Sequence, residues 1–403
     1  MDAAVAPGVT AQAEAHAGGR SWVERLQLTD FRNYASLTLR VGPSPVVLSG
    51  ANGSGKTNLL EALSLLSSGQ GLRRAPYPEL ARMGASRWAV AARLNTPQGA
   101  FNIGTGLAEG TEDGARAGRS TSRLVRIDGS NQSGSGALAE HVDVVWLTPA
   151  MDGLFTGSAS DRRRFLDRLI ACIDPTYRAL LGQFERAMQQ RNRLLADDVR
   201  DGARFAGLER IMADAGVAIA AARAASVAEL CAAIEARREA GSGAAFPWAE
   251  LALIGTLEAD LAERPAIEVE DGYFASLGRD RERDRAAGRT LEGPHRSDLA
   301  VGHGPKELPA KVCSTGEQKA LLVGVMLAHC DLVARRRDGA APLLLLDEIT
   351  AHLDPIRRAA LFDEIVALGS QAWMSGTDPD AFAALGDRAQ FWRVEEGRLT
   401  PRA

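Results

Sequence analysis

Eight consecutive residues, 50–57, have the types and spacing of a loop that binds phosphate groups. They fit the pattern of a glycine, four residues, and then Gly-Lys-Ser/Thr. Glycines let the backbone adopt positive φ angles, so that successive N–H groups can point at one anion. The Lys56 ammonium can pair with the β- and γ-phosphates, and the Thr57 hydroxyl can bind Mg²⁺. The sequence therefore predicts a nucleoside triphosphate site formed by Gly50, Ala51, Asn52, Gly53, Ser54, Gly55, Lys56 and Thr57.

The segments on either side of this loop are those that such a site needs. Residues 46–48 form a short apolar run typical of a buried strand, and residues 58–66 have the apolar spacing of a helix. A helix that starts at the loop adds its dipole and its free N–H groups to the anion site. The alternative is a glycine-rich turn without a ligand, and the strand and helix argue against it.

A second candidate region is an apolar strand, residues 341–346, that is followed by two carboxylates. Ligands of open α/β sheets bind at the C-terminal ends of the strands. Asp347 is then placed to share a Mg²⁺ ion with Thr57, and Glu348 to orient or deprotonate an attacking water. The alternative is that both acids only stabilise the N-terminus of a helix.

Residues 314–319 precede an apolar helix that we predict over 320–328. Ser314 is a plausible N-cap, with Glu317 at the capping-box position. A Ser-Gly pair at a helix start is also an anion site. This candidate signature comprises Ser314, Thr315, Gly316, Glu317 and Gln318, and further along the chain come Asp354 and a last strand, 371–375, that ends near Thr377.

Composition limits the class of protein. The chain has 403 residues, 45% apolar residues and a net charge of −4, so it has core material for two or three domains and no overall charge that indicates nucleic acid. Its four cysteines lack metal-ligand spacing, which fits a reducing cytoplasm. We expect residues 1–20 to be a disordered tail, no membrane span, and a cytoplasmic location.

The remaining pattern predicts a mixed α/β chain. Residues 22–41 read as a two-stranded lead-in with Arg32 and Asn33 in its turn, and Arg32 is either a solvated turn charge or a nucleotide contact. Strands are expected at 88–94, 100–105, 123–127 and 142–147, with a loop at 109–121. Helical spacing over 161–239, with a break near 197–202, predicts two helices that form an antiparallel arm. The charged run 279–289 is expected to be a solvated helix.

The order of these motifs resembles the ATP-binding-cassette ATPases, and the long insertion before the signature points to their DNA-repair and chromosome-organising branch. Within it the chain is similar to the RecF family of bacterial recombination mediators from about residue 22 to its end. The motifs that carry this resemblance are Leu28-x-x-Phe31-Arg32-Asn33-Tyr34, the phosphate loop with residues 58–62, residues 162–167, residues 293–296, residues 314–319 and the strand into Asp347-Glu348.

The resemblance implies an α/β fold in which an ABC-type ATPase head, residues 21–152 and 285–403, carries an inserted helical arm, residues 153–284. It also implies a head-to-head dimer that forms on ATP. Ser314 and Gly316 would then reach the γ-phosphate of the partner subunit, Asp354 would lie at the interface, and hydrolysis at Glu348 would release the dimer. ATP and Mg²⁺ are the implied cofactors.

The implied function is DNA binding beside single-stranded gaps, in gap repair and replication restart, with RecR and RecO helping to load RecA. Candidate phosphate contacts are basic residues of the head (Arg73, Arg74 and Arg82) and of the arm (Arg186, Arg191 and Arg193).

The chain departs from the family pattern at three places. It has Pro149-Ala150-Met151-Asp152 where the family has a proline and an acidic pair, so Asp152 is the remaining candidate for the metal- and water-sensing loop. Ser297 follows residues 293–296 where an acid is usual. Thr377 stands where transporter ATPases have a histidine, which would suit slow hydrolysis.

Three alternatives stay open. A transporter ATPase subunit would have a shorter insertion and a histidine near Thr377. Another SMC-like or nuclease-associated ATPase would have longer heptad arms or a nuclease partner. In a nucleotide-dependent scaffold without turnover, Glu348 would be structural.

Overall fold

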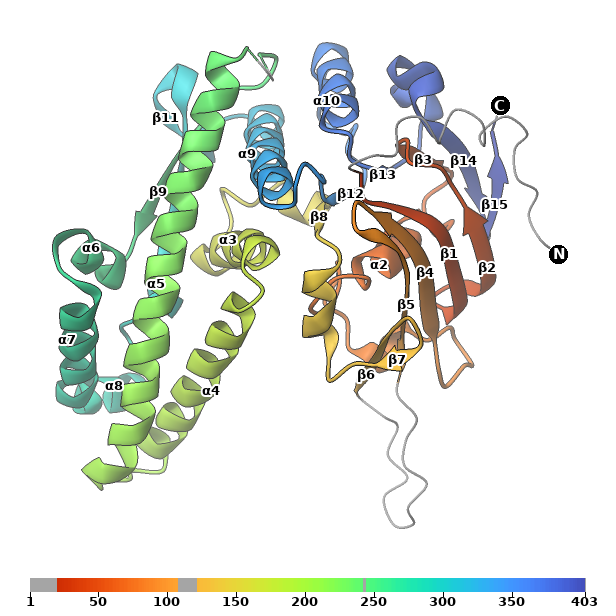
Figure 1. Ribbon diagram of the computed structural model, residues 1–403. Coiled ribbons are helices and arrows are strands. Elements are labelled where there is room, and N and C mark those ends of the chain that lie inside the picture. Colours follow the sequence, from red (N-terminus) through yellow and green to blue (C-terminus); the bar gives the residue numbers. More distant parts are fainter. Residues whose placement is uncertain (1–19, 108–121, 242–243, 403) are drawn as a thin grey trace, which may run out of the picture. The chain divides into compact units, whose positions relative to one another are not determined.

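The computed structural model describes residues 20–107, 122–241 and 244–402 (Figure 1). The chain forms two compact units. The first contains the residues up to Asp152, Gly241–Phe246 and the residues from Met326 onward; the second contains Gly153–Ala240 and Pro247–Val325. Apart from Arg20, the tail predicted at 1–20 lies outside the described residues, and so does the loop predicted at 109–121.

The first unit contains an antiparallel sheet in the order β2-β1-β4-β5-β6-β7. The chain forms β1 and β2 as a hairpin with Arg32 and Asn33 in its turn, which confirms the predicted lead-in. The strands expected at 88–94, 100–105 and 123–127 are also present. The bounds are β1 (Trp22–Phe31), β2 (Tyr34–Arg40), β4 (Ala89–Thr96), β5 (Gly99–Leu107), β6 (Arg123–Ile127) and β7 (Ser130–Asn131).

The second sheet of this unit has the order β15-β14-β3-β13-β12-β8, and its neighbours from β14 to β8 are parallel. All residues of β3, β12, β13 and β8 are buried, which accounts for their continuous apolar runs. Its parallel strands end at one edge, where the phosphate loop and Asp347 lie. The bounds are β3 (Val46–Ser49), β8 (Val144–Leu147), β12 (Leu343–Leu346), β13 (Ala372–Gly376), β14 (Gln390–Glu395) and β15 (Arg398–Pro401).

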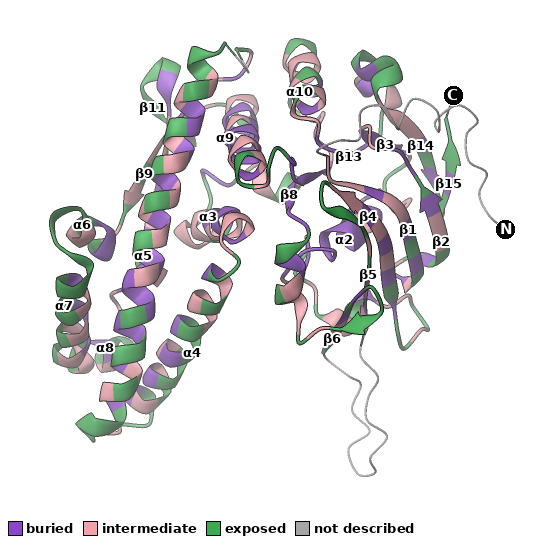
Figure 2. Cartoon of the chain, in the orientation of Figure 1, coloured by how far each residue is buried: buried purple, intermediate pink, exposed green. Residues whose placement is uncertain are grey.

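Helix α2 (Lys56–Ser64) connects the two sheets of the first unit through one apolar core. Its residues Leu59, Leu60 and Leu63 are fully buried and pack in one cluster with side chains from both sheets. Most of α2 is drawn in purple, the colour of buried residues, in Figure 2. The unit also contains α10 (Pro355–Leu368) and the 3₁₀ segments η1 (Tyr77–Leu80), η2 (Ser135–Glu140), η3 (Pro149–Met151) and η7 (Pro379–Arg388).

The second unit is mainly helical. The predicted break near 197–202 is confirmed, because α4 (Tyr177–Ala196) ends and α5 (Gly202–Glu239) begins there. The two helices are antiparallel: Arg191 pairs with Glu209, and Phe184 lies against Gly216. The other elements are α3 (Ala159–Ile173), α6 (Thr256–Glu263), α7 (Ala266–Arg279), α8 (Arg281–Ala287), η4 (Pro294–Arg296), η5 (Gly304–Lys306), η6 (Ala310–Val312), and a sheet of β9 (Ala249–Ile254), β10 (Asp298–His303) and β11 (Leu308–Pro309).

Helix α5 is, within the described ranges, the helix whose length and composition would allow it to cross a membrane. From the sequence, no membrane span is predicted. The helix nevertheless buries Glu209 and Arg223, and both form ion pairs with residues of their own unit. Charged residues that are buried and paired within a folded unit are typical of an internal helix.

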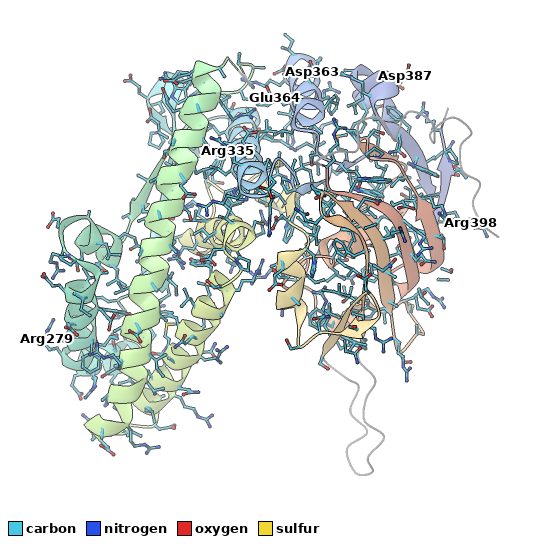
Figure 3. All side chains as sticks on the ribbon, in the orientation of Figure 1. Arg279, Arg335, Asp363, Glu364, Asp387 and Arg398 are labelled. Atoms are coloured by element: carbon cyan, nitrogen blue, oxygen red, sulfur yellow. The ribbon has the colours of Figure 1, made fainter. Side chains whose placement is uncertain are left out.

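Charged side chains otherwise lie mostly on the outside of each unit. Figure 3 labels examples on α7 (Arg279), α10 (Asp363) and β15 (Arg398), and all three are exposed. The run 279–289, predicted as one solvated helix, contains α8 and the end of α7, and its Asp284 is buried. Helix α9 (Thr315–Arg336) begins in the second unit and ends in the first. The predicted boundaries of head and arm at residues 153 and 284 stay a prediction.

Candidate functional site

The phosphate loop connects β3 to α2, as the sequence predicts. Gly55 adopts φ +119°, and a Cβ there would lie 2.6 Å from Asn33 Nδ2 and 2.8 Å from the Tyr34 hydroxyl. This position therefore requires glycine for both its backbone angle and its close contacts. Lys56 Nζ turns back over the loop and donates to the carbonyl oxygens of Gly50 (2.7 Å) and Ala51 (3.0 Å). The ammonium is thus held beside the backbone that would surround the phosphates.

Thr57 and Asp347, which are 290 positions apart, lie in direct contact. The Thr57 hydroxyl donates to the Asp347 carboxylate, with Oγ1 at 3.0 and 3.1 Å from its two oxygens. The contact forms because β3 and β12 both pair with β13 in one parallel sheet, so that the residues after them meet at its C-terminal edge.

Ser375 is a residue of this site that the sequence reasoning missed. Its hydroxyl donates to Asp347 Oδ1 (2.6 Å) and accepts from the backbone N–H of Glu348 (3.0 Å). Ser375 is fully buried on β13, where the neighbouring Met374 pairs with Leu346 of β12. A polar residue near the end of an otherwise apolar strand is a signal that could have identified it.

Glu348 lies at the mouth of the site. Its φ of +50° is unusual for a residue with a side chain, and the hydrogen bond from its N–H to Ser375 holds this conformation. The carboxylate oxygen Oε1 is 3.8 Å from Lys56 Nζ, and the side chain is 30% exposed. A carboxylate beside the phosphate loop that still contacts solvent can accept a proton from a water molecule.

The donor set fits Mg²⁺. Thr57 and Asp347 offer a hydroxyl and a carboxylate, and Mg²⁺ prefers oxygen ligands of this kind. Among the residues that the structure describes, no group of three or more His, Cys, Asp or Glu side chains is arranged to hold a metal. A Mg²⁺ ion here would therefore take its other ligands from phosphate oxygens and water, as is usual for this ion.

The turn between β1 and β2 supports the loop. Asn33 Nδ2 donates to the Ser54 carbonyl (3.1 Å), and the Tyr34 hydroxyl donates to the Gly55 carbonyl (3.0 Å). Arg32 donates through Nε and Nη2 to both carboxylate oxygens of Glu61 on α2, at 2.8 and 2.9 Å. The guanidinium of Arg32 anchors the turn to α2, and the role of Arg32 as a nucleotide contact stays a prediction.

Three other predicted residues lie in the first unit. Asp152 follows η3, and its Oδ2 is 3.5 Å from Nδ1 of His352, in the segment after Glu348. Asp354 is the N-cap of α10 and accepts from the N–H of Arg357 (2.9 Å). Thr377 is exposed immediately after β13. Through this pair, the residues that follow Glu348 contact Asp152, which is the last residue of the first unit before the chain enters the second.

The candidate signature belongs to the second unit, at the start of α9. The capping box is present: Ser314 Oγ accepts from the N–H of Glu317, whose Oε2 accepts from the Ser314 N–H (3.0 Å). The bonds that Glu317 accepts, first from Lys306 and then from Ser314, lower its pKa to about 2. Gln318 Nε2 donates to the Cys313 carbonyl (2.8 Å), and Thr315 and Gly316 lie in the first turn.

The prediction that Arg191 contacts DNA is wrong. Arg191 is 0% exposed and uses its guanidinium within the second unit. Arg73 and Arg82 lie at the surface of the first unit, each with a carboxylate partner. The exposed residues that stay candidates without a contradiction are Arg74, Arg186 and Arg193. Helical periodicity could have separated Arg191 from Arg193, because residues two apart lie on opposite faces of a helix and Arg191 shares the buried face with Phe184 and Leu195.

Comparison of the whole sequence with known proteins assigns the chain to the family that its motifs resemble. The family model for the RecF/RecN/SMC N-terminal domain matches residues 22–382. The chain is 52% identical over 380 residues to the DNA replication and repair protein RecF of Mesorhizobium japonicum, covering 94% of this chain and 97% of that one. It is also 52% identical, over 382 residues, to the RecF protein of Allorhizobium ampelinum, with 94% and 99% covered.

Solved structures share the fold. A structure described as the recombination mediator protein RecF-ATPrS in the RecFOR pathway superposes with a TM-score of 0.80 at 20% identity, covering 96% of this chain and 100% of that chain. The Smc head domain of Pyrococcus furiosus, with an extended coiled coil, superposes with a TM-score of 0.51 at 18% identity, covering 95% and 96%. The architecture is thus that of an ABC-type ATPase head with a helical insertion.

Proposed function

The chain belongs to the RecF/RecN/SMC family, and we propose that it is an ATP-dependent DNA-binding protein of replication and repair. The observation that carries the proposal is the connected set of contacts from Thr57 through Asp347 and Ser375 to Glu348. These contacts support the roles proposed for Thr57 and Asp347 in holding a metal ion and for Glu348 as a general base beside the phosphate loop. The relatives named as DNA replication and repair proteins support the biological role.

Each residue of the site has a chemical role in this proposal. Lys56 and the loop N–H groups bind the phosphates, and Thr57 and Asp347 hold Mg²⁺, which would neutralise charge on the phosphate oxygens. Glu348 orients a water molecule and accepts its proton. Ser375 fixes both acids, because one hydroxyl bonds the Asp347 carboxylate and the Glu348 backbone. The side chain of Arg32 is engaged by Glu61, so its contribution to nucleotide binding is to position Asn33.

We further propose that ATP joins two copies of the chain head to head. In this arrangement the γ-phosphate bound by one subunit is contacted by Ser314 and Gly316 of the other, with Asp354 at the interface. The N-terminus of α9 suits an anion because its first N–H groups are free of intrahelical partners. Weak hydrolysis at Glu348 would then set how long the dimer stays on DNA, and Thr377 in place of a histidine fits a slow step.

The finer biological role belongs to the same proposal. The protein would bind duplex DNA beside single-stranded gaps and, with RecR and RecO, help to load RecA during gap repair and replication restart. In this proposal the ATPase head comprises residues 21–152 and 285–403, and the helical arm comprises residues 153–284. Exposed basic residues such as Arg74, Arg186 and Arg193 are available for phosphate contacts.

The decisive experiment measures binding to fluorescently labelled duplex, single-stranded and gapped DNA, with and without ATP and Mg²⁺, at two fixed salt concentrations. We expect ATP to strengthen binding to duplex and gapped DNA, and Lys56→Ala to remove that effect together with ATP binding. Sedimentation velocity should show an ATP-dependent dimer. An absence of any ATP effect on all three DNAs would refute the repair function, and an unchanged sedimentation coefficient at saturating ATP would refute the dimer.

A further inference from the structure

The capping box of α9 engages Ser314, a residue that the proposed dimer would use to bind the γ-phosphate. Glu317 Oε2 accepts from the Ser314 N–H (3.0 Å) and from the Ser314 hydroxyl (2.9 Å). The N–H groups of Thr315 and Gly316 take no part in this box. Ser314 is exposed, so a phosphate oxygen that approaches its hydroxyl from solvent arrives beside the Glu317 carboxylate.

A carboxylate at this position opposes the binding of phosphate in two ways. It already accepts the hydrogen bonds of the Ser314 donors that a phosphate oxygen would need. It is also an anion, and repulsion between like charges at this range weakens binding by about tenfold. The start of α9 is therefore a good site for the γ-phosphate only if the charge of Glu317 is neutralised.

Lys306 supplies the neutralising charge from another element of the second unit. The residue ends η5, between β10 and β11, and its Nζ donates to Glu317 Oε1, the carboxylate oxygen that Ser314 does not use. The hydrogen bond from Lys306 is the largest cause of the low pKa of Glu317, which keeps this acid ionised. The Lys306 side chain is 49% exposed and that of Glu317 is 20% exposed. The two side chains thus form a neutral pair at the surface, directly beside Ser314.

We propose that Lys306 is a positioning residue for the γ-phosphate, a role that rests on the ATP dimer proposed above. Lys306 holds and neutralises the Glu317 carboxylate, so that the γ-phosphate bound by the other subunit can approach Ser314. The Ser314 hydroxyl then exchanges its bond to Glu317 for one to a phosphate oxygen, while Glu317 keeps its bond to Lys306. Glu317 is thus an internal competitor of the γ-phosphate, and Lys306 sets how strongly it competes.

Sedimentation velocity of the full-length protein, over a range of ATP concentrations with Mg²⁺, tests this role. Lys306→Ala leaves the charge of Glu317 without its cation, and it should raise the ATP concentration for half-maximal dimer formation by about tenfold. Lys306→Arg keeps the positive charge and should stay near the parent. Arg279→Ala, which removes an exposed cation from α7 of the same unit (Figure 3), controls for net charge and should also stay near the parent.

Glu317→Gln tests whether Lys306 acts through Glu317. Glutamine can keep the capping box without a negative charge, so this variant should form the dimer at a lower ATP concentration than the parent. The double variant, Lys306→Ala with Glu317→Gln, should return to the parent value. Equal dimer formation by Lys306→Ala and the parent, or a double variant as weak as Lys306→Ala alone, would overturn the proposal.

Two further measurements separate this role from a structural one. The monomer binds ATP through its own phosphate loop, so equilibrium ATP binding at low protein concentration should be unchanged in every variant. Urea unfolding should also give nearly the parent midpoint. If Lys306→Ala loses stability or monomer ATP binding in step with the dimer, Lys306 is structural and the proposal is overturned. A parent that does not dimerise with ATP refutes the dimer itself, whereas a dimer that is insensitive to Lys306 refutes only this inference.

Discussion

The molecule contains two buried polar clusters, one in each unit, with opposite properties. In the second unit, Arg191 donates to Glu209 (3.1 Å), Asp284 (2.7 Å), Thr290 (2.8 Å) and the Leu277 carbonyl (2.7 Å). Its charge is therefore fully paired, away from solvent. In the first unit, Lys56 donates to two backbone carbonyls, and its Nζ is 3.8 Å from Oε1 of Glu348. Its charge remains available to a ligand.

The difference shows that burial of a charged residue does not by itself indicate its role. A cluster whose donors and acceptors are all paired has no group left to bind a ligand, and its energy contributes to the fold. A cluster whose strongest charge is held only by backbone carbonyls can exchange those bonds for phosphate oxygens. We therefore expect variants of the two clusters to affect different measurements.

The largest effect is expected on the free energy of unfolding, for a variant in the cluster around Arg191. Arg191→Met should lower the free energy of unfolding by about 3–5 kcal/mol, because Glu209 and Asp284 are left buried without their cation. Urea unfolding followed by circular dichroism measures this change. Arg193→Met, on the exposed side of the same helix, should stay within about 0.5 kcal/mol of the parent. Similar stabilities of the two variants would contradict the comparison.

Variants in the cluster of the first unit, which contains Lys56 and Glu348, should change the rate of ATP hydrolysis. Glu348→Gln should lower the rate of ATP hydrolysis by about 10²–10⁴-fold, because the amide cannot accept the proton of water. Its ATP affinity and free energy of unfolding should be nearly those of the parent, and the protein should stay on DNA longer with ATP. Single-turnover hydrolysis and equilibrium ATP binding test this pair of outcomes. Hydrolysis at the parent rate would remove Glu348 from the mechanism.

Ser375 should have a smaller effect through the residues that it positions. Ser375→Ala removes the hydrogen bonds to Asp347 and to the Glu348 N–H, and it should raise the Mg²⁺ concentration for half-maximal hydrolysis by about 10–100-fold. Ser375→Thr should restore much of the loss. The matched control is Ser49→Ala at the end of the adjacent strand β3, where the hydroxyl donates to the Trp392 carbonyl and, among the described residues, does not contact Asp347 or Glu348. An equal Mg²⁺ dependence in both alanine variants would assign Ser375 a purely structural role.

The smallest effect concerns the exposed cap of α9. Its capping-box acid, Glu317, has a pKa lowered to about 2. A lowered folded-state pKa means that the cap contributes to stability above the ordinary pKa near 4.5 and loses that contribution as the pH falls towards 2. NMR titration of the Glu317 carboxyl should show this midpoint, and Lys306→Ala should raise it, since Lys306 is the largest cause. A midpoint near 4.5 in the parent would contradict the cap geometry.

Much of the fold followed from the sequence where local pattern and tertiary packing agree. The hairpin at 22–41, the three strands of the meander and the division between α4 and α5 all have patterns that packing does not override. The site could be predicted where a fixed spacing carries the chemistry, as in the phosphate loop. It could not be predicted where a side chain depends on a distant partner, as Arg32 depends on Glu61 and Arg191 on Glu209.

The sequence by itself determined that a phosphate loop and an apolar strand followed by Asp347 and Glu348 exist, because glycine positions and apolar runs act through local backbone geometry. Only the tertiary structure decided that Thr57 meets Asp347, that Ser375 holds both acids, and that Arg191 is removed from the surface. These outcomes depend on strand order and helix pairing, which bring together residues that are 290 positions apart for Thr57 and Asp347, 28 for Ser375 and Asp347, and 18 for Arg191 and Glu209.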